Sequence, residues 1–387
     1  MTRPELPQRF TIAAALAFAL AAGPALAHHG FGRFVMNEDV EYEGTLTSVD
    51  LVNPHSYMNF DAVDAEGNVI PMRCEMRAAT LIRRSGWSLE MFVPGSHVEL
   101  QGHPHRDDPH SCYLEAFTLG DAPAIDRNDQ FLSAAPVNSA DRPLRLPSGE
   151  PNISGDWAVE QAVLTIPPSG GNGALVPKSL REAYAAGEIT LEEIRARNPA
   201  PSQPVYTEAG QVAADAFRMW SPEDNPRLSC QPTSIIFDWT FDWPVNRITQ
   251  TTTDDGESVI DIDYGLFSQT RRIHLGMESH PADIEPSNAG HSIGRWEGVT
   301  LVVDTVGFTP GVLVPPTRNS DQLHIVERFT LDTERVALER QYTAEDPVYL
   351  AAPYTGSNTV YLSEVPFERH PCEELTYEFT TDGAGEE

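Results

Sequence analysis

The stretch "YEGTLTSVDLVNPHSYMNFDAVD", residues 42–64, carries the clearest structural signal in the chain. Apolar and polar residues alternate on both sides of an Asn-Pro-His turn, which is the period-two pattern of half-buried strands. A third alternating run, "NVIPMRCEM" at residues 68–76, follows a Gly-containing turn. The pattern therefore predicts three consecutive strands at the start of a small β domain.

One short helix and two more strands are expected next. "AATLIRRSGW", residues 78–87, has an apolar pair followed by a basic step and suits a short helix. "SHVELQGH" at residues 96–103 and "YLEAFTLGD" at residues 113–121 alternate again. The order strand, strand, strand, helix, strand, strand is that of the OB-fold, whose ligands bind one face bordered by the loops between strands 1 and 2 and strands 4 and 5. We expect an OB-like five-stranded barrel over residues 28–121.

A second, larger domain is expected after a linker. Residues 122–151 are rich in Asp, Asn, Pro and Ser, which is typical of a connecting segment. Within residues 152–380, helical patterns predict an insertion at about residues 177–220. A hairpin with an Asp-Gly turn over residues 248–265 opens a long run of short strands. The fold class predicted is mainly β, with the OB-like barrel followed by a larger antiparallel β-barrel or sandwich.

The start of the chain has the three parts of a secretory signal. Two arginines precede an apolar segment at residues 10–22, and Ala25-Leu26-Ala27 forms a small-x-small cleavage site. The apolar segment is shorter than the roughly 18 residues that a membrane span needs, and no later stretch reaches that length. Residues 1–27 are therefore predicted to be a signal peptide cleaved after Ala27, and the mature protein to be periplasmic or secreted with no membrane span.

The net charge excludes some classes of partner, and the cysteines predict disulfides. A formal net charge of −31 disfavours nucleic acid and anionic membrane surfaces. Four cysteines without C-x-x-C spacing in an exported chain are more typical of disulfides than of a metal site. Cys74 and Cys112 fall in the first third of the chain, and Cys230 and Cys372 in the remainder. This grouping favours one bridge in each domain, although four cysteines allow three pairings.

Histidines are concentrated in the parts of the first domain that border the OB ligand face. The loop between strands 1 and 2 contains the Asn-Pro-His turn, and "GHPHRDDPHS" at residues 102–111 joins strands 4 and 5. Cleavage would expose an N-terminal histidine whose amine and ring nitrogen can chelate one ion, and copper(II) prefers such nitrogen-rich sites, with zinc as the alternative. Solvated loop tips and a simple turn would explain the same residues. The predicted metal ligands are His28, His29, His55, His103 and His105.

The second domain has its densest polar stretch at "GHSIGRWEG", residues 290–298. In "LHIVERF", residues 323–329, alternation places Glu327 on an otherwise apolar face, where a carboxylate needs a partner such as Arg295, Arg271 or Arg272. Two interpretations stay open, a buried ion pair that ties strands together or an acid–base group beside a ligand. The candidate catalytic residues are Glu327, His291 and Arg295, and the candidate ligand-binding residues are Arg272, His274, Trp296, Glu297 and His324.

Two resemblances accompany these motifs. "AHHGFGRF" at residues 27–34, the Asn-Pro-His turn, the Trp-ended "RRSGW" helix and the "PGSHVELQG" strand resemble a widespread family of uncharacterised exported bacterial proteins over about residues 25–120. The later pattern R-R-I-[YH]-L, H-P, G-H-S-I-G-R-W-E-G and L-H-x-V-E-R-F resembles an uncharacterised domain of secreted bacterial proteins, although Val299 stands where that domain usually has Asp. The resemblances imply export and a division into two domains, and they imply no reaction.

Three functions are compatible with the sequence. The first is an exported protein that binds copper on the OB face and a small molecule in the second domain. The second is a periplasmic enzyme with acid–base residues in the second domain, and the third is a structural or interaction module of the cell envelope. No nucleophile elbow, phosphate loop, dinucleotide fingerprint or H-E-x-x-H motif occurs, so the common hydrolase, nucleotide-binding and zinc-protease classes are not supported.

Overall fold

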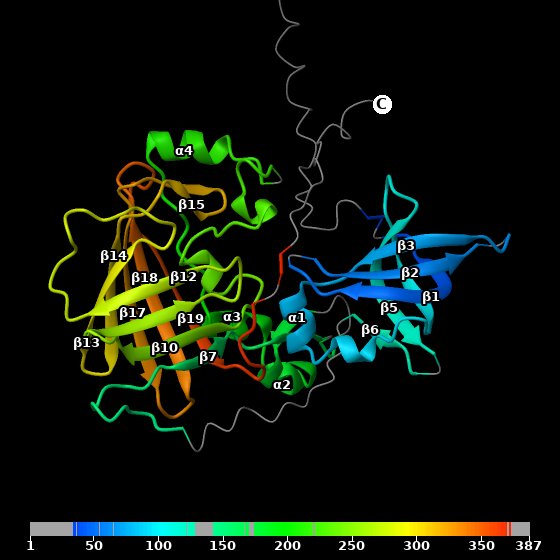
Figure 1. Cartoon of the computed structure of the whole chain (residues 1–387), viewed down its shortest axis with the longest axis horizontal. Helices are drawn as coiled ribbons and strands as arrows, with labels where there is room; N and C mark the ends of the chain where they lie inside the picture. The colour runs from blue at the N-terminus through cyan, green and yellow to red at the C-terminus, as the bar shows by residue number, and fades with distance from the viewer. Residues whose placement is uncertain are drawn as a thin grey trace, which may run out of the picture.

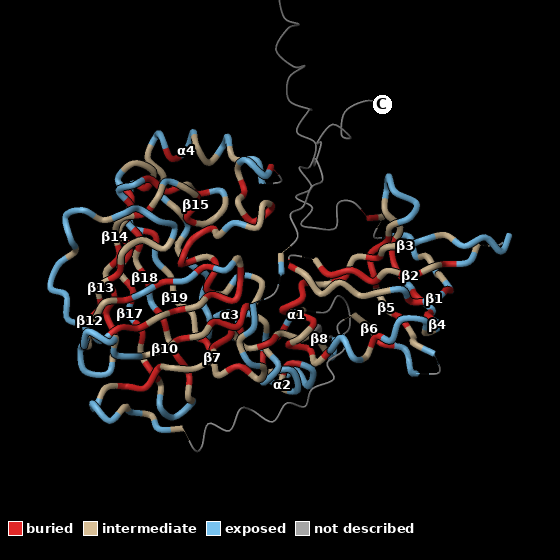
Figure 2. Tube along the Cα trace, viewed as in Figure 1, coloured by how far each residue is buried: buried red, intermediate tan, exposed pale blue. Residues whose placement is uncertain are grey.

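Two β-barrels follow one another along the chain and lie beside each other in the computed structural model (Figure 1). The structure describes residues 34–372 except 36, 54, 65, 121, 128–141, 166, 170–173, 220 and 370. Buried residues follow the strands of both barrels, whereas exposed residues follow the loops (Figure 2). The predicted mainly β class, with a small barrel before a larger one, is confirmed.

The first barrel has the strand order expected of an OB-like domain. Its strands pair in the order β3-β2-β1-β4-β5-β6, and a parallel pairing of β3 with β5 closes it. The helix α1 lies between β3 and β4 in the sequence, as the OB order requires. The elements are β1 (Val40–Asp50), β2 (Tyr57–Val63), β3 (Val69–Glu75), α1 (Ala79–Arg84), η1 (Leu89–Met91), β4 (His97–Pro104), β5 (Ser111–Leu119) and β6 (Ile125–Asp126).

Alternation in the first three strands fills the core of this barrel, because Leu46, Met58 and Phe60 are each at most 1% exposed. Gly44 is required where β1 crosses β2, since a Cβ there would lie 2.1 Å from the carbonyl oxygen of Asp61. The Cys74–Cys112 disulfide joins the two strands that close the barrel. Local patterning and one covalent link therefore specify the same closed sheet.

The second barrel is closed by nine strands in the order β10-β11-β12-β13-β14-β17-β18-β19-β7. They are β7 (Gly155–Ala158), β10 (Asn246–Thr252), β11 (Ser258–Asp263), β12 (Thr270–Leu275), β13 (His291–Glu297), β14 (Thr300–Val306), β17 (His324–Asp332), β18 (Ala337–Glu345) and β19 (Tyr354–Leu362). Two small hairpins flank it, β8 (Ala162–Thr165) with β9 (Ala174–Pro177) and β15 (Gly311–Val314) with β16 (Thr317–Asn319).

Short helices connect the first of these strands to the rest. The predicted insertion at about residues 177–220 contains η3 (Lys178–Leu180), α2 (Arg181–Ala185), α3 (Leu191–Arg197) and α4 (Glu208–Asp215). Two further turns, η4 (Pro226–Ser229) and η5 (Phe237–Trp239), lead into β10. Among the described residues, no helix is long and apolar enough to cross a membrane.

One pair of neighbouring strands departs from the antiparallel arrangement that the sequence predicts. β12 and β13 run parallel, whereas every other pair in the nine-stranded barrel is antiparallel. A closed ring with an odd number of strands cannot alternate direction all the way round, so one parallel pair is unavoidable. Because β12 and β13 point in the same direction, the chain must cross from the end of β12 back to the end of the barrel at which β12 begins. Residues 276–290 make this crossing.

The two barrels are joined by α1 and by the segment after β19. The side chain of Arg84 is buried between them and donates hydrogen bonds to Glu364 and to the carbonyl oxygens of Val159 and Trp243. After β19 the chain passes the first barrel, where the backbone N–H of Asn53 donates to the carbonyl oxygen of Pro371 at 3.1 Å. The Asn-Pro-His turn thus contacts the end of the second unit.

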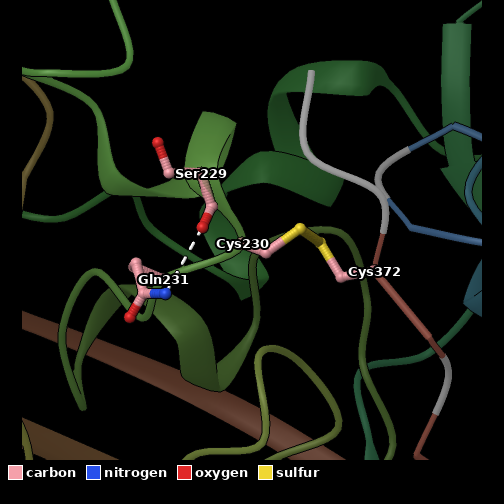
Figure 3. Close-up of a disulfide and its surroundings, with 4 residues drawn as sticks. All are labelled: Ser229, Cys230, Gln231 and Cys372. Carbon is pink, nitrogen blue, oxygen red and sulfur yellow. Dashed lines mark hydrogen bonds between the residues drawn. A yellow bond between two sulfur atoms is a disulfide. The ribbon is translucent and has the colours of Figure 1, made fainter. Parts of the chain in front are cut away.

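A disulfide anchors this last segment. Cys372, which forms a β-bridge with Asn53, is bonded to Cys230 in the second unit (Figure 3). With Cys74–Cys112 in the first barrel, the predicted grouping of the four cysteines into an early pair and a late pair is confirmed. The late bridge also links the two units, because Cys372 is bonded to Cys230 in the second unit and pairs with Asn53 of the first.

Candidate functional site

Four histidines and an aspartate meet on the outer face of the second barrel. The histidine cluster consists of His274, His280, His291, Asp304 and His324. Strand alternation explains its outward position, because the residues next to these in the strands, Ile273, Ser292, Thr305 and Ile325, are fully buried. The strands β12, β13, β14 and β17 are consecutive neighbours in the sheet. Their outward side chains therefore share one patch of surface.

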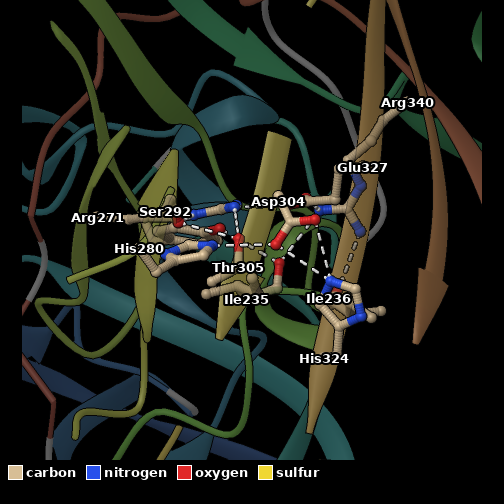
Figure 4. A network of polar contacts seen from close by, with 11 residues as sticks. Ile235, Ile236, Arg271, His280, Ser292, Asp304, Thr305, His324, Glu327 and Arg340 are labelled. Atoms are coloured by element: carbon tan, nitrogen blue, oxygen red, sulfur yellow. Dashed lines mark hydrogen bonds and ion pairs between the residues drawn. The ribbon is translucent and has the colours of Figure 1, made fainter. Parts of the chain in front are cut away.

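His280 is the centre of the cluster, and it comes from the 276–290 segment rather than from a strand. Its Nδ1 lies 2.8 Å from His291 Nδ1, and its Nε2 lies 3.0 Å from Asp304 Oδ1. On the other side of Asp304, His324 Nε2 lies 3.1 Å from both carboxylate oxygens (Figure 4). The segment that the parallel β12–β13 pair requires thus supplies the residue that joins the others.

The hydrogen bonds determine which ring nitrogen carries a proton. Burial alone would raise the pKa of Asp304, but hydrogen bonds from His280 and His324 outweigh burial and hold that pKa below its ordinary value. Asp304 is then ionised and only accepts, so Nε2 of His280 donates to it. When this is the one proton on the His280 ring, Nδ1 of His280 accepts. The Nδ1–H of His291 donates to that acceptor, and the Nε2 of His291 keeps its lone pair.

His291 is held in its neutral form. Burial lowers its pKa, and the proximity of His274 and His280 lowers it further. The rings of His274 and His291 lie parallel within 8°, with centroids 5.1 Å apart, and Nδ1 of His274 lies 2.7 Å from Glu257 Oε1. A neutral imidazole with an available nitrogen lone pair can accept a proton near neutral pH.

On the inner face of the same strands, behind the histidine cluster, lies a buried ion-pair network. Arg271 Nη2 is 2.5 Å from Glu327 Oε2, Arg340 Nη1 is 3.4 Å from Glu327 Oε1, and all three side chains are fully buried. Arg271 also donates to Ser292 and Thr305 at 2.8 Å each (Figure 4). These contacts cross β12, β13, β14, β17 and β18, which include every strand that contributes to the histidine cluster.

Glu327 therefore lies in the core and not beside an open ligand site. Of the three arginines proposed as its partner, Arg271 is paired with it, whereas Arg272 and Arg295 have other partners. Its second partner is Arg340, which was not among the predicted partners. Burial, and after it the charge of Glu327, raises the pKa of Tyr264 to about 12 against the opposing effect of Arg271, so this buried hydroxyl is neutral.

The other predicted residues of the second domain are distributed as follows. His274, His291 and His324 are brought together in the histidine cluster. Arg272 forms two hydrogen bonds with Asp261, at 2.7 and 2.9 Å, on the surface. Arg295 is largely exposed and pairs with Glu297, which also pairs with Arg328. Trp296 packs against the hydrophobic core. These four residues lie outside the cluster.

Sequence reasoning missed His280 and Asp304. Alternation in "TLVVDTV" does predict an outward carboxylate at position 304, so that residue was accessible to the analysis. His280 was not, because it lies in an irregular segment whose path depends on the strand order.

The predicted metal ligands of the first domain are only partly described, since His28 and His29 lie outside the described residues. His103 Nδ1 donates to the carbonyl oxygen of Glu38 at 3.0 Å, and its Nε2 lies 3.6 Å from Glu115 Oε2. His105 Nδ1 accepts from the backbone N–H groups of Asp107 and Asp108, so its ring proton lies on Nε2. His55 Nδ1 is 2.5 Å from Glu75 Oε1.

These three histidines do not form a complete ligand set. Within the described parts of the chain, no three His, Cys, Asp or Glu side chains are arranged to hold a metal ion. His103 fits the role of a single nitrogen donor, whereas His105 does not fit in its present tautomer.

Comparison with known proteins covers the first barrel. Residues 16–112 match a family of unknown function, DUF6152. The match extends from before β1 to the start of β5, so the second barrel lies outside it. A search of curated protein sequences finds no match to the chain. The comparisons therefore assign no reaction, and the function must be argued from the site.

Proposed function

We propose that the protein is an enzyme whose second domain uses His291 as a general base. The observation that supports this proposal is the hydrogen-bonded order Asp304, His280, His291, with separations of 3.0 and 2.8 Å. A carboxylate that orients one imidazole, which in turn orients a second, fixes the tautomer of the last ring. Nε2 of His291 is then the atom that removes a proton from a substrate or from a water molecule.

The site is open enough for a substrate to reach it. The side chains of His280 and His324 are 17% and 36% exposed, and His291 is partly exposed. The small-molecule ligand expected for the second domain is, in this proposal, the substrate of His291. Glu327 and Arg295 have no direct part, because Glu327 is enclosed in the core and Arg295 lies four residues along β13, about 13 Å at roughly 3.3 Å per residue.

Hydrolysis of p-nitrophenyl acetate tests the base, because this activated ester reports on imidazole reactivity without knowledge of the natural substrate. Wild-type protein is expected to accelerate hydrolysis, with a rate that falls as His291 becomes protonated below about pH 6.5. His291→Gln should reduce the rate by at least 100-fold, the lower range for a positioned acid–base group. Asp304→Asn should give a smaller loss, since it changes the tautomer and leaves the ring in place.

The matched control is His97→Gln, which removes an exposed histidine of the first barrel whose nearest carboxylates are 3.7 and 3.8 Å away. This variant should hydrolyse the ester at the wild-type rate. If His291→Gln is as active as His97→Gln, the hydrogen-bonded order does not produce a base and the proposal is wrong.

A second candidate function, copper binding by the first domain, is favoured by the position of the N-terminal segment. Phe34 forms a β-bridge with His105, and the backbone N–H of Val35 donates to the carbonyl oxygen of Pro104 at 2.9 Å. Only five residues lie between His28 and Phe34, so a chain cleaved after Ala27 is short enough to reach His103, whose Nε2 faces Glu115 at 3.6 Å. Copper(II), or zinc, would then bind the N-terminal amine, the first ring and one further imidazole.

Calorimetric titration tests this second candidate. Protein that begins at His28 should bind copper(II) more tightly than protein with one alanine added before His28, because the addition removes the amine from the chelate. Equal affinities would contradict an N-terminal site.

Export is part of both proposals. The N-terminal signal pattern and the two disulfides support an oxidising, extracytoplasmic location, since disulfides persist in such compartments. Mass spectrometry of protein secreted from its own gene should show an N-terminus at His28, and retention of residues 1–27 would contradict cleavage after Ala27.

A further inference from the structure

We propose that the cavity between the two barrels binds a small molecule with an oxyanion group, such as a carboxylate, and a planar apolar part. The cavity has a volume of about 1250 Å³ and is lined from both barrels. Ligand sites typically occupy a few hundred to 1000 Å³ and occur preferentially at domain interfaces. The histidine cluster does not line this cavity, so the inference is independent of the proposed base.

The wall contributed by the first barrel carries the positive charge. Arg77 lines the cavity and forms no ion pair or side-chain hydrogen bond with any described residue. Arg127 lines the same wall and is paired with Glu115 at 3.2 Å. Burial lowers the pKa of Arg77, and Arg127 acts in the same direction, whereas Tyr113 and Asp126 act against it. A half-buried guanidinium beside a second one is stabilised by an anion.

The charged groups on the cavity wall leave Arg77 as the group available to a ligand. His55 and Glu75 are paired with each other, and Asp242 is paired with Arg227 at 2.5 Å. Guanidinium groups recognise carboxylates and other oxyanions by two parallel hydrogen bonds. The charge of Asp126 acts on Arg77 without an ion pair or hydrogen bond between the two, and a bound anion would provide the direct contact that this guanidinium lacks.

The wall contributed by the second barrel is largely aromatic. Phe237 and Phe241 stack with ring centroids 4.3 Å apart, and Phe241 is 42% exposed although it is a large apolar residue. Tyr342 and Tyr354 line the cavity, and burial raises the pKa of both, so their hydroxyls are neutral. Aromatic faces with a few polar groups suit a planar apolar part of a ligand.

The backbone on this wall is also strained. Asp242 and Trp243, which both line the cavity, have φ values of 60° and 55°. Non-glycine residues rarely adopt this left-handed region, and consecutive examples persist only where the surrounding structure holds them. Such strain is concentrated at binding and catalytic sites, which agrees with a ligand site at this wall.

Titration with 8-anilinonaphthalene-1-sulfonate tests the inference, because this fluorescent probe combines an anion with planar rings. Wild-type protein is expected to bind one equivalent with increased fluorescence. Arg77→Gln should weaken binding by roughly tenfold to a hundredfold, since it removes a charge-assisted contact. Arg77→Lys keeps the charge without the planar fork and should give an intermediate loss. The matched control is Arg295→Gln, which removes an exposed surface arginine and should bind as the wild type does.

A second probe separates the anion from the rings. N-phenyl-1-naphthylamine lacks the sulfonate and should bind Arg77→Gln and wild type equally. Circular dichroism verifies that each variant is folded. If Arg77→Gln does not fold, Arg77→Lys takes its place in both titrations. The inference is overturned if wild type does not bind the anionic probe, if Arg77→Gln binds it as tightly as wild type, or if the neutral probe is weakened to the same extent.

Discussion

Arg84→Ala is the perturbation that should most affect the association of the two barrels. The side chain of Arg84 is only 2% exposed, and its three hydrogen-bonding groups all reach residues of the second unit. They donate to Glu364 at 2.9 Å, to Trp243 O at 3.1 Å and to Val159 O at 2.7 Å. Truncation leaves one carboxylate and two carbonyl groups without this donor.

The magnitude follows from these contacts. Removing one partner of a buried ion pair costs about 3–5 kcal/mol, because the remaining charge loses its compensation. The side chain of Glu364 is 22% exposed and also accepts a hydrogen bond from Gln161, so the cost of removing its arginine partner lies at the lower end of that range. The two carbonyl groups add to it, at roughly 1–3 kcal/mol for each buried acceptor left unsatisfied. With the lower end of each range, about 3 kcal/mol for the ion pair and about 1 kcal/mol for each carbonyl group, we expect the free energy of unfolding to fall by about 5 kcal/mol.

Urea unfolding measures this loss, and small-angle X-ray scattering measures whether the barrels separate. Arg84→Ala should shift the unfolding midpoint to lower urea and increase the radius of gyration in native buffer. Arg295→Gln is the control, because exposed ion pairs contribute about 0–1 kcal/mol. An Arg84→Ala protein with the midpoint and the scattering profile of Arg295→Gln would refute the role of Arg84 as the principal contact between the barrels.

Three further predictions follow from buried charge, titration and the disulfides. Glu327→Gln leaves two buried arginines without their carboxylate and should lower the free energy of unfolding by about 3–5 kcal/mol in chemical denaturation, and a loss below about 1 kcal/mol would contradict the buried network. Folding lowers the pKa of His291, so the contribution of this histidine to the free energy of unfolding is present above pH 6.5 and is lost as the pH falls below that value. The free energy of unfolding, measured from pH 7.5 to 5, should therefore decline less in His291→Gln than in wild type. Parallel curves for the two proteins would show that folding does not lower this pKa. Cys230→Ser should cost about 5 kcal/mol and Cys74→Ser about 4 kcal/mol by the loop-entropy relation, from sequence separations of 142 and 38, and the reverse order in thermal unfolding would refute a loop-length origin.

The sequence predicts a small barrel followed by a larger antiparallel barrel or sandwich, and it names His274, His291 and His324 as candidate residues. It could not predict that these residues meet, because their proximity depends on which strands are neighbours. The parallel β12–β13 pair follows from the odd number of strands, and that number includes β7, which lies before the helical insertion. Information so distant in the sequence is absent from any local pattern.

The buried carboxylate shows the same limit at a single residue. Alternation placed Glu327 on the inner face, and burial required a cation near it. The sequence offered several arginines, and only the sheet register decides among them, because Val303 pairs with Glu327 and Glu327 pairs with Tyr342 across the neighbouring strands. Arg271 reaches Glu327 from β12, which is distant in the chain, whereas Arg340 reaches it from β18, the strand that directly follows β17. The sequence therefore limits the possible partners to a few arginines but does not select among them.

The two faces of the second barrel depend on each other through these strands. β13 contributes Ser292 to the inner network and His291 to the outer cluster, and β14 contributes Thr305 and Asp304 in the same way. A shift of either strand by one residue would exchange the two faces and break both sets of contacts.

The general base that we propose needs separations held to about half an ångström. The buried Arg271–Glu327 pair fixes the positions of the strands from the inside, at the desolvation cost that such a pair carries. This pair thus lies where it holds the strands of the histidine cluster in register, and for this reason we expect Glu327→Gln to alter the reactivity of His291 as well as the stability of the fold.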